Sequence, residues 1–156
     1  MRKSTYYKKK DRKPDHKYGR TDMSLFINYL MKAGKKSVAE NVFYSALELI
    51  EKDSKQDPVK VFEKAIENAS PRLEVVSRRV GGANYQIPRE VRSERKFFLA
   101  CQWIIEAAKS QKGKKIHKSL AEQLIETSNN EGQAIKKKQN VHRMAEANRA
   151  FASFLR

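Results

Sequence analysis

The stretch RLEVVSRRVGGANYQIPREV, residues 72–91, interrupts a sequence whose other apolar residues recur mostly at helical spacing. β-Branched and aromatic residues lie on both sides of its glycine pair, and residues 81–84 are typical of a tight turn. These features predict a β-hairpin. Pro88 has no backbone N–H to donate, so the second strand is expected to be a free edge. No other segment predicts a strand, and we therefore expect the hairpin to project from the fold and bind a partner.

Helical periods flank this hairpin on both sides. Apolar residues recur every three or four positions. Gly34 is a helix stop signal, and the Asp57-Pro58 pair is a helix start signal. The second helix places Val38 on its apolar face, the fourth places Trp103 at the flank of its apolar face, and the last extends to Phe151. The six helices are expected near residues 24–33, 38–52, 58–69, 93–108, 116–125 and 133–151.

The fold class that follows is mainly α: a six-helix single domain with a protruding two-stranded β-hairpin and a basic N-terminal arm. The arm is residues 1–20, which show neither a helical nor a strand period, and the domain is residues 21–156, including the hairpin at 72–91. A length of 156 residues suits one such domain.

Charge is concentrated in three parts of the chain. The sequence has 34 Lys and Arg against 18 Asp and Glu, a formal net charge of +16. Residues 1–20 carry net +7, residues 72–96 net +4 and residues 97–156 net +6, whereas residues 21–71 carry net −1. An excess of this size indicates a polyanionic partner.

Several classes of function find no support in the sequence. A single cysteine cannot form an internal disulfide, which indicates a reducing compartment. No apolar run approaches the roughly 20 residues that a membrane span requires. Cys101 lies on an apolar helix face and is expected to be a core thiol, and His142 with Glu146 is expected to be a surface ion pair. No catalytic residue, metal site or cofactor is predicted, and the chain is not expected to be an enzyme.

Residues 78–86 carry the most specific binding signal, and the last helix is charged by Lys136, Lys137, Lys138, Arg143 and Arg149. Arginine guanidinium groups bind phosphates bidentately, glycines let a nucleic-acid strand approach the protein backbone closely, and Tyr85 can stack on a base. The Gly34-Lys35-Lys36 turn can offer two ammonium groups to a phosphate, although its spacing does not fit a nucleotide-binding loop. RNA is one possible partner. A DNA-binding architectural protein is the alternative, which net charge alone favours equally.

Three separated motifs resemble one known family. They are SRRVGGANYQIP at residues 77–88, GKKS at 34–37 and HRMAEANRAFA at 142–152. In this order and spacing they resemble bacterial-type small-subunit ribosomal protein number seven. The resemblance implies a helical domain with a projecting hairpin that binds the 3′ major domain of small-subunit rRNA and nucleates head assembly. It also implies that the hairpin and last helix lie near exit-site tRNA and mRNA.

The resemblance further implies neighbouring head and platform proteins as partners, and no membrane or small-molecule substrate. It implies a cytoplasmic ribosome, although the sequence leaves open an organellar one. The residues predicted to lie near tRNA and mRNA are Gly81, Gly82, Ala83, Asn84, Tyr85, Arg143 and Arg149. The residues predicted to bind rRNA are Arg2, Lys3, Lys8, Lys9, Lys10, Arg12, Lys13, Lys35, Lys36, Arg72, Arg78, Arg79, Arg92, Arg95, Lys96, Lys114, Lys115, Lys136 and Lys137.

Overall fold

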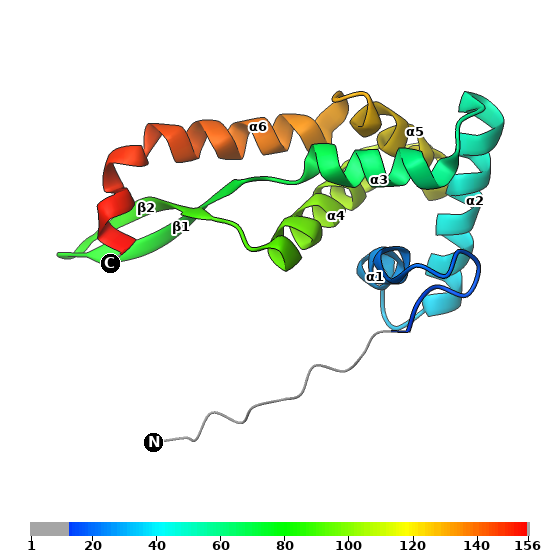
Figure 1. The fold of residues 1–156 in the computed structure, drawn as a ribbon, viewed down its shortest axis with the longest axis horizontal. Coiled ribbons are helices and arrows are strands. Elements are labelled where there is room, and N and C mark those ends of the chain that lie inside the picture. Colours follow the sequence, from blue (N-terminus) through cyan, green and yellow to red (C-terminus); the bar gives the residue numbers. More distant parts are fainter. Residues whose placement is uncertain (1–12, 156) are drawn as a thin grey trace, which may run out of the picture.

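A computed structural model describes residues 13–155, which form six α-helices, one antiparallel hairpin and a C-terminal 3-10 helix (Figure 1). The mainly α fold with a hairpin that the sequence predicts is confirmed. Within this part of the chain, every helix is too short or too polar to cross a lipid bilayer. The elements are α1 (Thr21–Leu30), α2 (Lys36–Ser54), α3 (Pro58–Ala69), β1 (Leu73–Val80), β2 (Ala83–Glu90), α4 (Ser93–Ser110), α5 (Ile116–Ser128), α6 (Gly132–Ala147) and η1 (Arg149–Leu155).

Helices α1 to α5 form a helical body around one apolar core. Its centre holds Phe26, Phe43 and Phe62, all fully buried, with ring centroids 5.2–5.6 Å apart. Two of these three pairs are edge-to-face, an arrangement that aromatic quadrupoles favour. Helix α5 packs against α2, α3 and α4. The core is therefore built from helices that are far apart in sequence.

The prediction that Val38 lies on the apolar face of α2 is wrong. Val38 is 56% exposed because the buried stripe of α2 begins one residue later, at Ala39, and continues through Phe43. One residue turns a helix by about 100°, which is enough to leave Val38 outside the stripe. Trp103 is only 6% exposed because α6 packs against α4 and covers the flank on which it lies.

Asp57 and Pro58 begin α3 as the sequence predicts. The Asp57 Oδ1 accepts a hydrogen bond of 3.0 Å from the backbone N–H of Val59, and Pro58 occupies the first turn. The carboxylate thereby satisfies one of the free N–H groups of the helix end.

The hairpin turns at Gly81 and Gly82 rather than over residues 81–84. Both glycines have positive φ angles, 58° and 90°, as a two-residue type I′ turn requires. This turn places Arg78 opposite Tyr85 and Glu74 opposite Arg89. At the base of the hairpin Ile87 is fully buried, whereas residues 81–84 at the tip are exposed.

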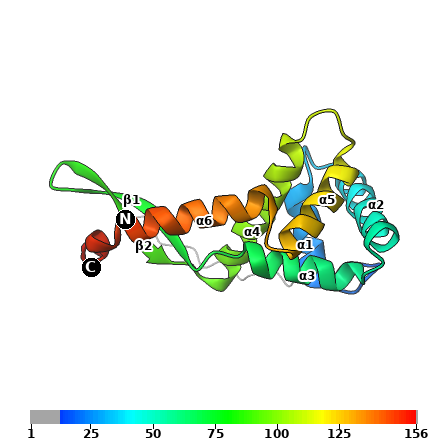
Figure 2. The same cartoon turned by 90° about the horizontal axis from the view of Figure 1, so that it is seen from above.

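Helix α6 and η1 run beside the hairpin and form with it an extension of the helical body (Figures 1 and 2). We call β1, β2, α6 and η1 the hairpin extension. The predicted last helix, which was to reach Phe151, ends instead at Ala147. The carbonyl of Met144 there accepts hydrogen bonds from the backbone N–H and from Nδ2 of Asn148, at 3.2 and 2.8 Å, so the side chain helps to cap the last turn. Residues 149–155 continue as 3-10 helix and lie against β2.

The end of the predicted N-terminal arm is anchored to the body. Asp15 is 6% exposed and accepts hydrogen bonds from the backbone N–H groups of Lys17 and Tyr18 and from the hydroxyl of Tyr44 in α2, at 3.2, 3.0 and 2.5 Å. The rest of the predicted arm, residues 1–12, lies outside the described residues.

Candidate nucleic-acid interface

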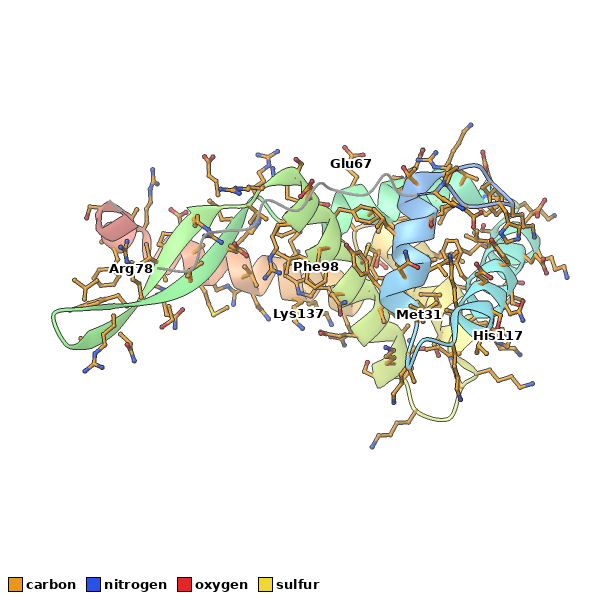
Figure 3. The ribbon with its side chains drawn as sticks, turned by 90° about the horizontal axis from the view of Figure 1, so that it is seen from below. Met31, Glu67, Arg78, Phe98, His117 and Lys137 are labelled. Carbon is orange, nitrogen blue, oxygen red and sulfur yellow. The ribbon has the colours of Figure 1, made fainter. Side chains whose placement is uncertain are left out.

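The two hairpin arginines lie on opposite faces of the extension. Arg78 is paired in register with Tyr85 and Arg79 with Asn84, and successive strand residues point to opposite faces. Both arginines are exposed. Figure 3 shows Arg78 on the hairpin at one end of the molecule, with Met31 and His117 at the other. The hairpin can therefore present a cation to each of two surfaces.

The hairpin tip is tied to the C-terminal segment through Tyr85. Its ring lies 5.1 Å from the ring of Phe151 in η1, and the side chain is half-buried. The other predicted tRNA-proximal residues at the tip, Gly81, Gly82, Ala83 and Asn84, are exposed. The ring contact brings the tip close to η1, which starts at Arg149. Two parts of the predicted tRNA and mRNA surface thus lie side by side.

The lysine run of α6 divides between the surface and the interior. Lys136 and Lys137 are exposed, and Lys137 forms an ion pair with Glu106 of α4. Lys138 is half-buried and donates a hydrogen bond of 2.6 Å to the backbone carbonyl of Asn68. Burial and the nearby Arg72 lower the pKa of Lys138. This lysine therefore contributes to the packing of α6 on α3 rather than to the outer surface.

His142 takes part in the same junction. Its Nε2 accepts a hydrogen bond of 3.1 Å from the backbone N–H of Arg72, the residue that precedes β1. Burial, followed by the charges of Lys138 and Arg72, lowers the pKa of His142 and favours the neutral imidazole that can accept this bond. The predicted ion pair with Glu146 does not form in this structure, and Glu146 pairs with Arg149 at 3.4 Å.

The start of α4 carries a second group of predicted contacts. Arg92 and Arg95 are exposed and Lys96 is half-buried. Arg95 forms an ion pair with Glu74 of β1 at 3.3 Å, and its guanidinium lies 5.1 Å from the centre of the Phe98 ring. The sequence did not predict a role for Glu74.

A third group lies at the far end of the helical body. Lys35 lines a groove of about 190 Å³ together with Lys109 and Ile116, so the turn before α2 and the start of α5 share one surface. Lys36 and Lys115 are exposed there, and Lys114 pairs with Glu122 at 2.7 Å. The predicted contacts therefore extend from the hairpin to the far end of the helical body. Of the predicted arm contacts, Lys13 is exposed, and Arg2, Lys3, Lys8, Lys9, Lys10 and Arg12 lie outside the described residues.

The described residues with candidate chemistry are Cys101 and the acidic and histidine side chains. Burial raises the pKa of the Cys101 thiol well above its usual range, which leaves it a neutral core group. Among residues 13–155, no three His, Cys, Asp or Glu side chains are grouped as metal ligands.

These features define a small, basic, mainly α-helical protein with a hairpin extension and cations exposed at both of its ends. A family model described as ribosomal protein S7p/S5e matches residues 1–149, and the chain belongs to this family. It is a family of ribosomal proteins, not of enzymes, as the sequence predicts.

Curated relatives named small ribosomal subunit protein uS7 agree with this assignment. The chain is 51% identical to that of Xanthobacter autotrophicus over 141 residues, 90% of each chain. It is 51% identical to that of Afipia carboxidovorans over 146 residues, 94% of each chain. It is 52% identical to that of Nitrobacter winogradskyi over 141 residues, 90% of each chain.

Proposed function

We propose that this chain is a structural component of the small ribosomal subunit that binds the 3′ major domain of small-subunit rRNA and nucleates assembly of the head. In this proposal its hairpin tip and C-terminal segment lie along the path of exit-site tRNA and mRNA. Its partners are rRNA, that tRNA and mRNA, and neighbouring proteins of the head and platform. The bacterial relatives support a cytoplasmic ribosome.

The observation that carries the proposal is the exposure of the predicted rRNA contacts. Among those that the structure describes, all but Lys96 are exposed, and they come from both ends of a molecule with formal net charge +16. The ion pairs of Lys114 with Glu122 and of Lys137 with Glu106 are exposed surface pairs. Such pairs contribute about 0–1 kcal/mol, so a phosphate can replace the carboxylate at little cost.

The contacts are suited to backbone and shape recognition rather than to a base code. Lysine ammonium groups and arginine forks bind phosphate oxygens, and these contacts fix the register of a protein on RNA without reading sequence. Half-buried Tyr85 lies beside an exposed glycine turn, where a base or sugar can approach the protein backbone closely.

Footprinting of the full chain on small-subunit rRNA tests the proposal directly. Protection confined to the 3′ major domain is expected, and protection elsewhere or none would contradict it. If about six to eight phosphates are engaged, the logarithm of affinity should fall with the logarithm of salt at a slope of about −5 to −7.

Competition separates RNA from DNA as the partner. We expect a head-domain rRNA fragment to displace labelled rRNA at physiological salt, and duplex DNA to do so far less well. Equal displacement by duplex DNA would favour the architectural DNA-binding alternative. It would remove the basis for an assembly function.

A further inference from the structure

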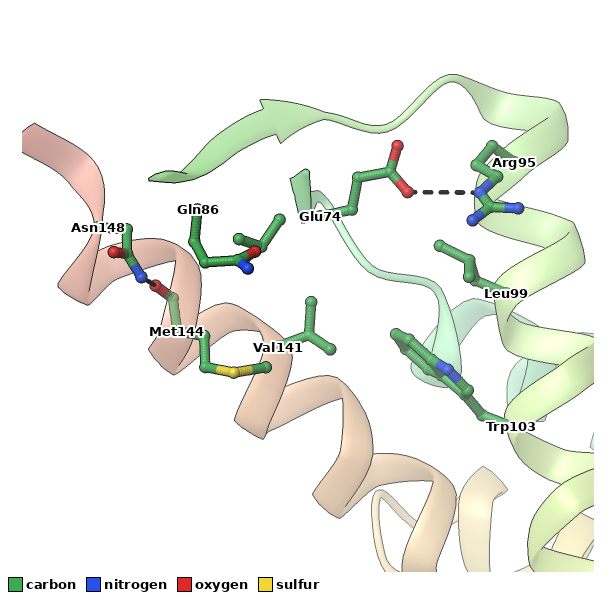
Figure 4. Close-up of a pocket in the computed structure, with 9 residues that line it drawn as sticks. Glu74, Gln86, Arg95, Leu99, Trp103, Val141, Met144 and Asn148 are labelled. Atoms are coloured by element: carbon green, nitrogen blue, oxygen red, sulfur yellow. Dashed lines mark hydrogen bonds and ion pairs between the residues drawn. The ribbon is translucent and has the colours of Figure 1, made fainter. Parts of the chain in front are cut away.

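Glu74 is a partly buried carboxylate that joins the hairpin to the helical body. Its side chain is 13% exposed, and its Oε1 accepts a hydrogen bond of 2.6 Å from Nη2 of Arg89, its register partner in β2. Its Oε2 accepts one of 3.3 Å from Nε of Arg95 in α4, as Figure 4 shows. One acidic side chain therefore orients two guanidinium groups from two different elements.

The two arginines keep most of their donors for another partner. Their side chains are 54% and 51% exposed, and each uses one of its nitrogens to reach Glu74. A guanidinium has five N–H donors in a planar fork, so several remain. Arg95 is held on a further side by the Phe98 ring, 5.1 Å away. Each guanidinium thus keeps N–H donors that Glu74 does not engage.

A third arginine completes the group. Arg92, exposed at the start of α4, lines a recess of about 310 Å³ together with Glu74, Arg89, Glu90 and Arg95. This is about ten times the roughly 30 Å³ that one water molecule occupies in the liquid, so a phosphate group has room. Three arginines against two carboxylates leave the lining with net +1.

We propose that Glu74 is a positioning residue that holds Arg89 and Arg95, beside Arg92, as a preorganised binding site for an rRNA backbone phosphate. The inference rests on the proposed rRNA binding and adds to it a specific site and a carboxylate that acts without touching RNA. A long side chain that is ordered before binding loses less conformational freedom on binding. The acid thereby strengthens binding to an anion.

The ionisation of Glu74 agrees with this role. Partial burial alone would raise the pKa of Glu74, but the hydrogen bonds from Arg89 and Arg95 outweigh it and hold the pKa below its usual value. The carboxylate is therefore charged at neutral pH and can hold both guanidinium groups.

An effect of net charge alone and an effect of side-chain positioning predict opposite changes in rRNA affinity for Glu74→Gln. The substitution removes a negative charge, so charge alone predicts tighter rRNA binding. Positioning predicts binding about tenfold weaker, because two side chains must be ordered anew. The matched control is Glu67→Gln, an exposed residue of α3 with the same change of charge. It is expected to leave the affinity unchanged or slightly raised.

The experiment is filter binding of the full chain to a head-domain rRNA fragment. If the wild type does not bind, the proposed function fails. If it binds and Glu74→Gln binds as tightly as Glu67→Gln, the positioning role fails. In an Arg89→Ala, Arg95→Ala background, Glu74→Gln should have no further effect, and an undiminished effect there would also overturn the proposal.

A second variant avoids any loss of fold caused by Glu74→Gln. Arg89→Lys combined with Arg95→Lys keeps the charge but replaces both planar forks by point charges. We expect rRNA binding about fivefold to tenfold weaker, with circular dichroism unchanged. Wild-type affinity in this variant would contradict the proposed site.

Discussion

The helical body and the hairpin extension differ in what holds them together. The body closes around three fully buried phenylalanines, and the sequence of its first half, residues 21–71, carries net −1. The extension has few fully buried side chains and is held by a hydrogen bond to His142, a ring contact at Phe151 and the carboxylate of Glu74. The extension, residues 73–90 and 132–155, carries net +5.

The difference separates stability from binding within one small chain. Changes in the body should affect unfolding of the whole molecule, because its apolar contacts join distant parts of the sequence. Changes in the extension should affect RNA binding or local opening while the body remains folded.

The largest effect is expected in the body. Phe62→Ala removes a fully buried ring that contacts both Phe26 and Phe43 and leaves a cavity. The free energy of unfolding should fall by about 3–5 kcal/mol, as measured by urea denaturation. A loss below about 1 kcal/mol would show that the body does not depend on this core.

The next effect concerns binding. Replacing Arg78 and Arg79 together by alanine should lower rRNA affinity by about 2 kcal/mol, on the order of thirtyfold, because two charged donors are lost. The free energy of unfolding should change by less than about 0.5 kcal/mol, since both side chains are exposed. The control replaces two exposed lysines of α3, Lys60→Ala with Lys64→Ala, and has the same change of charge. Equal loss in both pairs would mean that net charge alone governs affinity.

The same division explains what the sequence could predict. Periodic apolar residues and the Asp57-Pro58 start signal located the helices of the body. A helix that packs on a core must place apolar residues every three or four positions, so its position can be read from the sequence. The predicted cations of the extension are exposed, as charged side chains generally are. Their binding to RNA stays a prediction.

The parts that escaped prediction depend on register and on tertiary contacts. A turn spanning residues 81–84 would pair Glu74 with Val91, whereas the observed turn at Gly81-Gly82 pairs it with Arg89. Two adjacent glycines adopt positive φ angles without strain, as observed here, and this pair in the sequence is the signal that favours the two-residue turn. The burial of Trp103 by α6 and the hydrogen bond from Arg72 to His142 join residues far apart in sequence, which no local pattern reveals.

A smaller, local effect is expected where the hairpin meets η1. Phe151→Ala removes the ring contact with Tyr85, worth about 1 kcal/mol. Amide hydrogen exchange in β2 near Tyr85 should become about fivefold faster, while urea denaturation of the body is unchanged. Phe151→Leu keeps apolar volume without the ring and should give an intermediate rate. Unaltered exchange in Phe151→Ala would show that η1 does not restrain the tip.

The smallest effect is a dependence of the extension on pH through His142. Its pKa lies below the ordinary 6.5, first because of burial and then because of Lys138 and Arg72. Between these two values the unfolded or opened chain binds more protons than the packed one, so stability is complete above pH 6.5 and declines as pH falls through the lower pKa. Protonation also removes the acceptor for the N–H of Arg72.

This dependence can be measured by amide hydrogen exchange. We expect faster exchange at the start of β1 as pH falls from 7.5 to 5.5, after correction for the intrinsic rate. His142→Gln keeps a neutral acceptor and should abolish this dependence, and a dependence that persists in the variant would assign it to another group. Glu74 cannot imitate the effect, because its pKa is lowered from 4.5 and it stays ionised throughout this range.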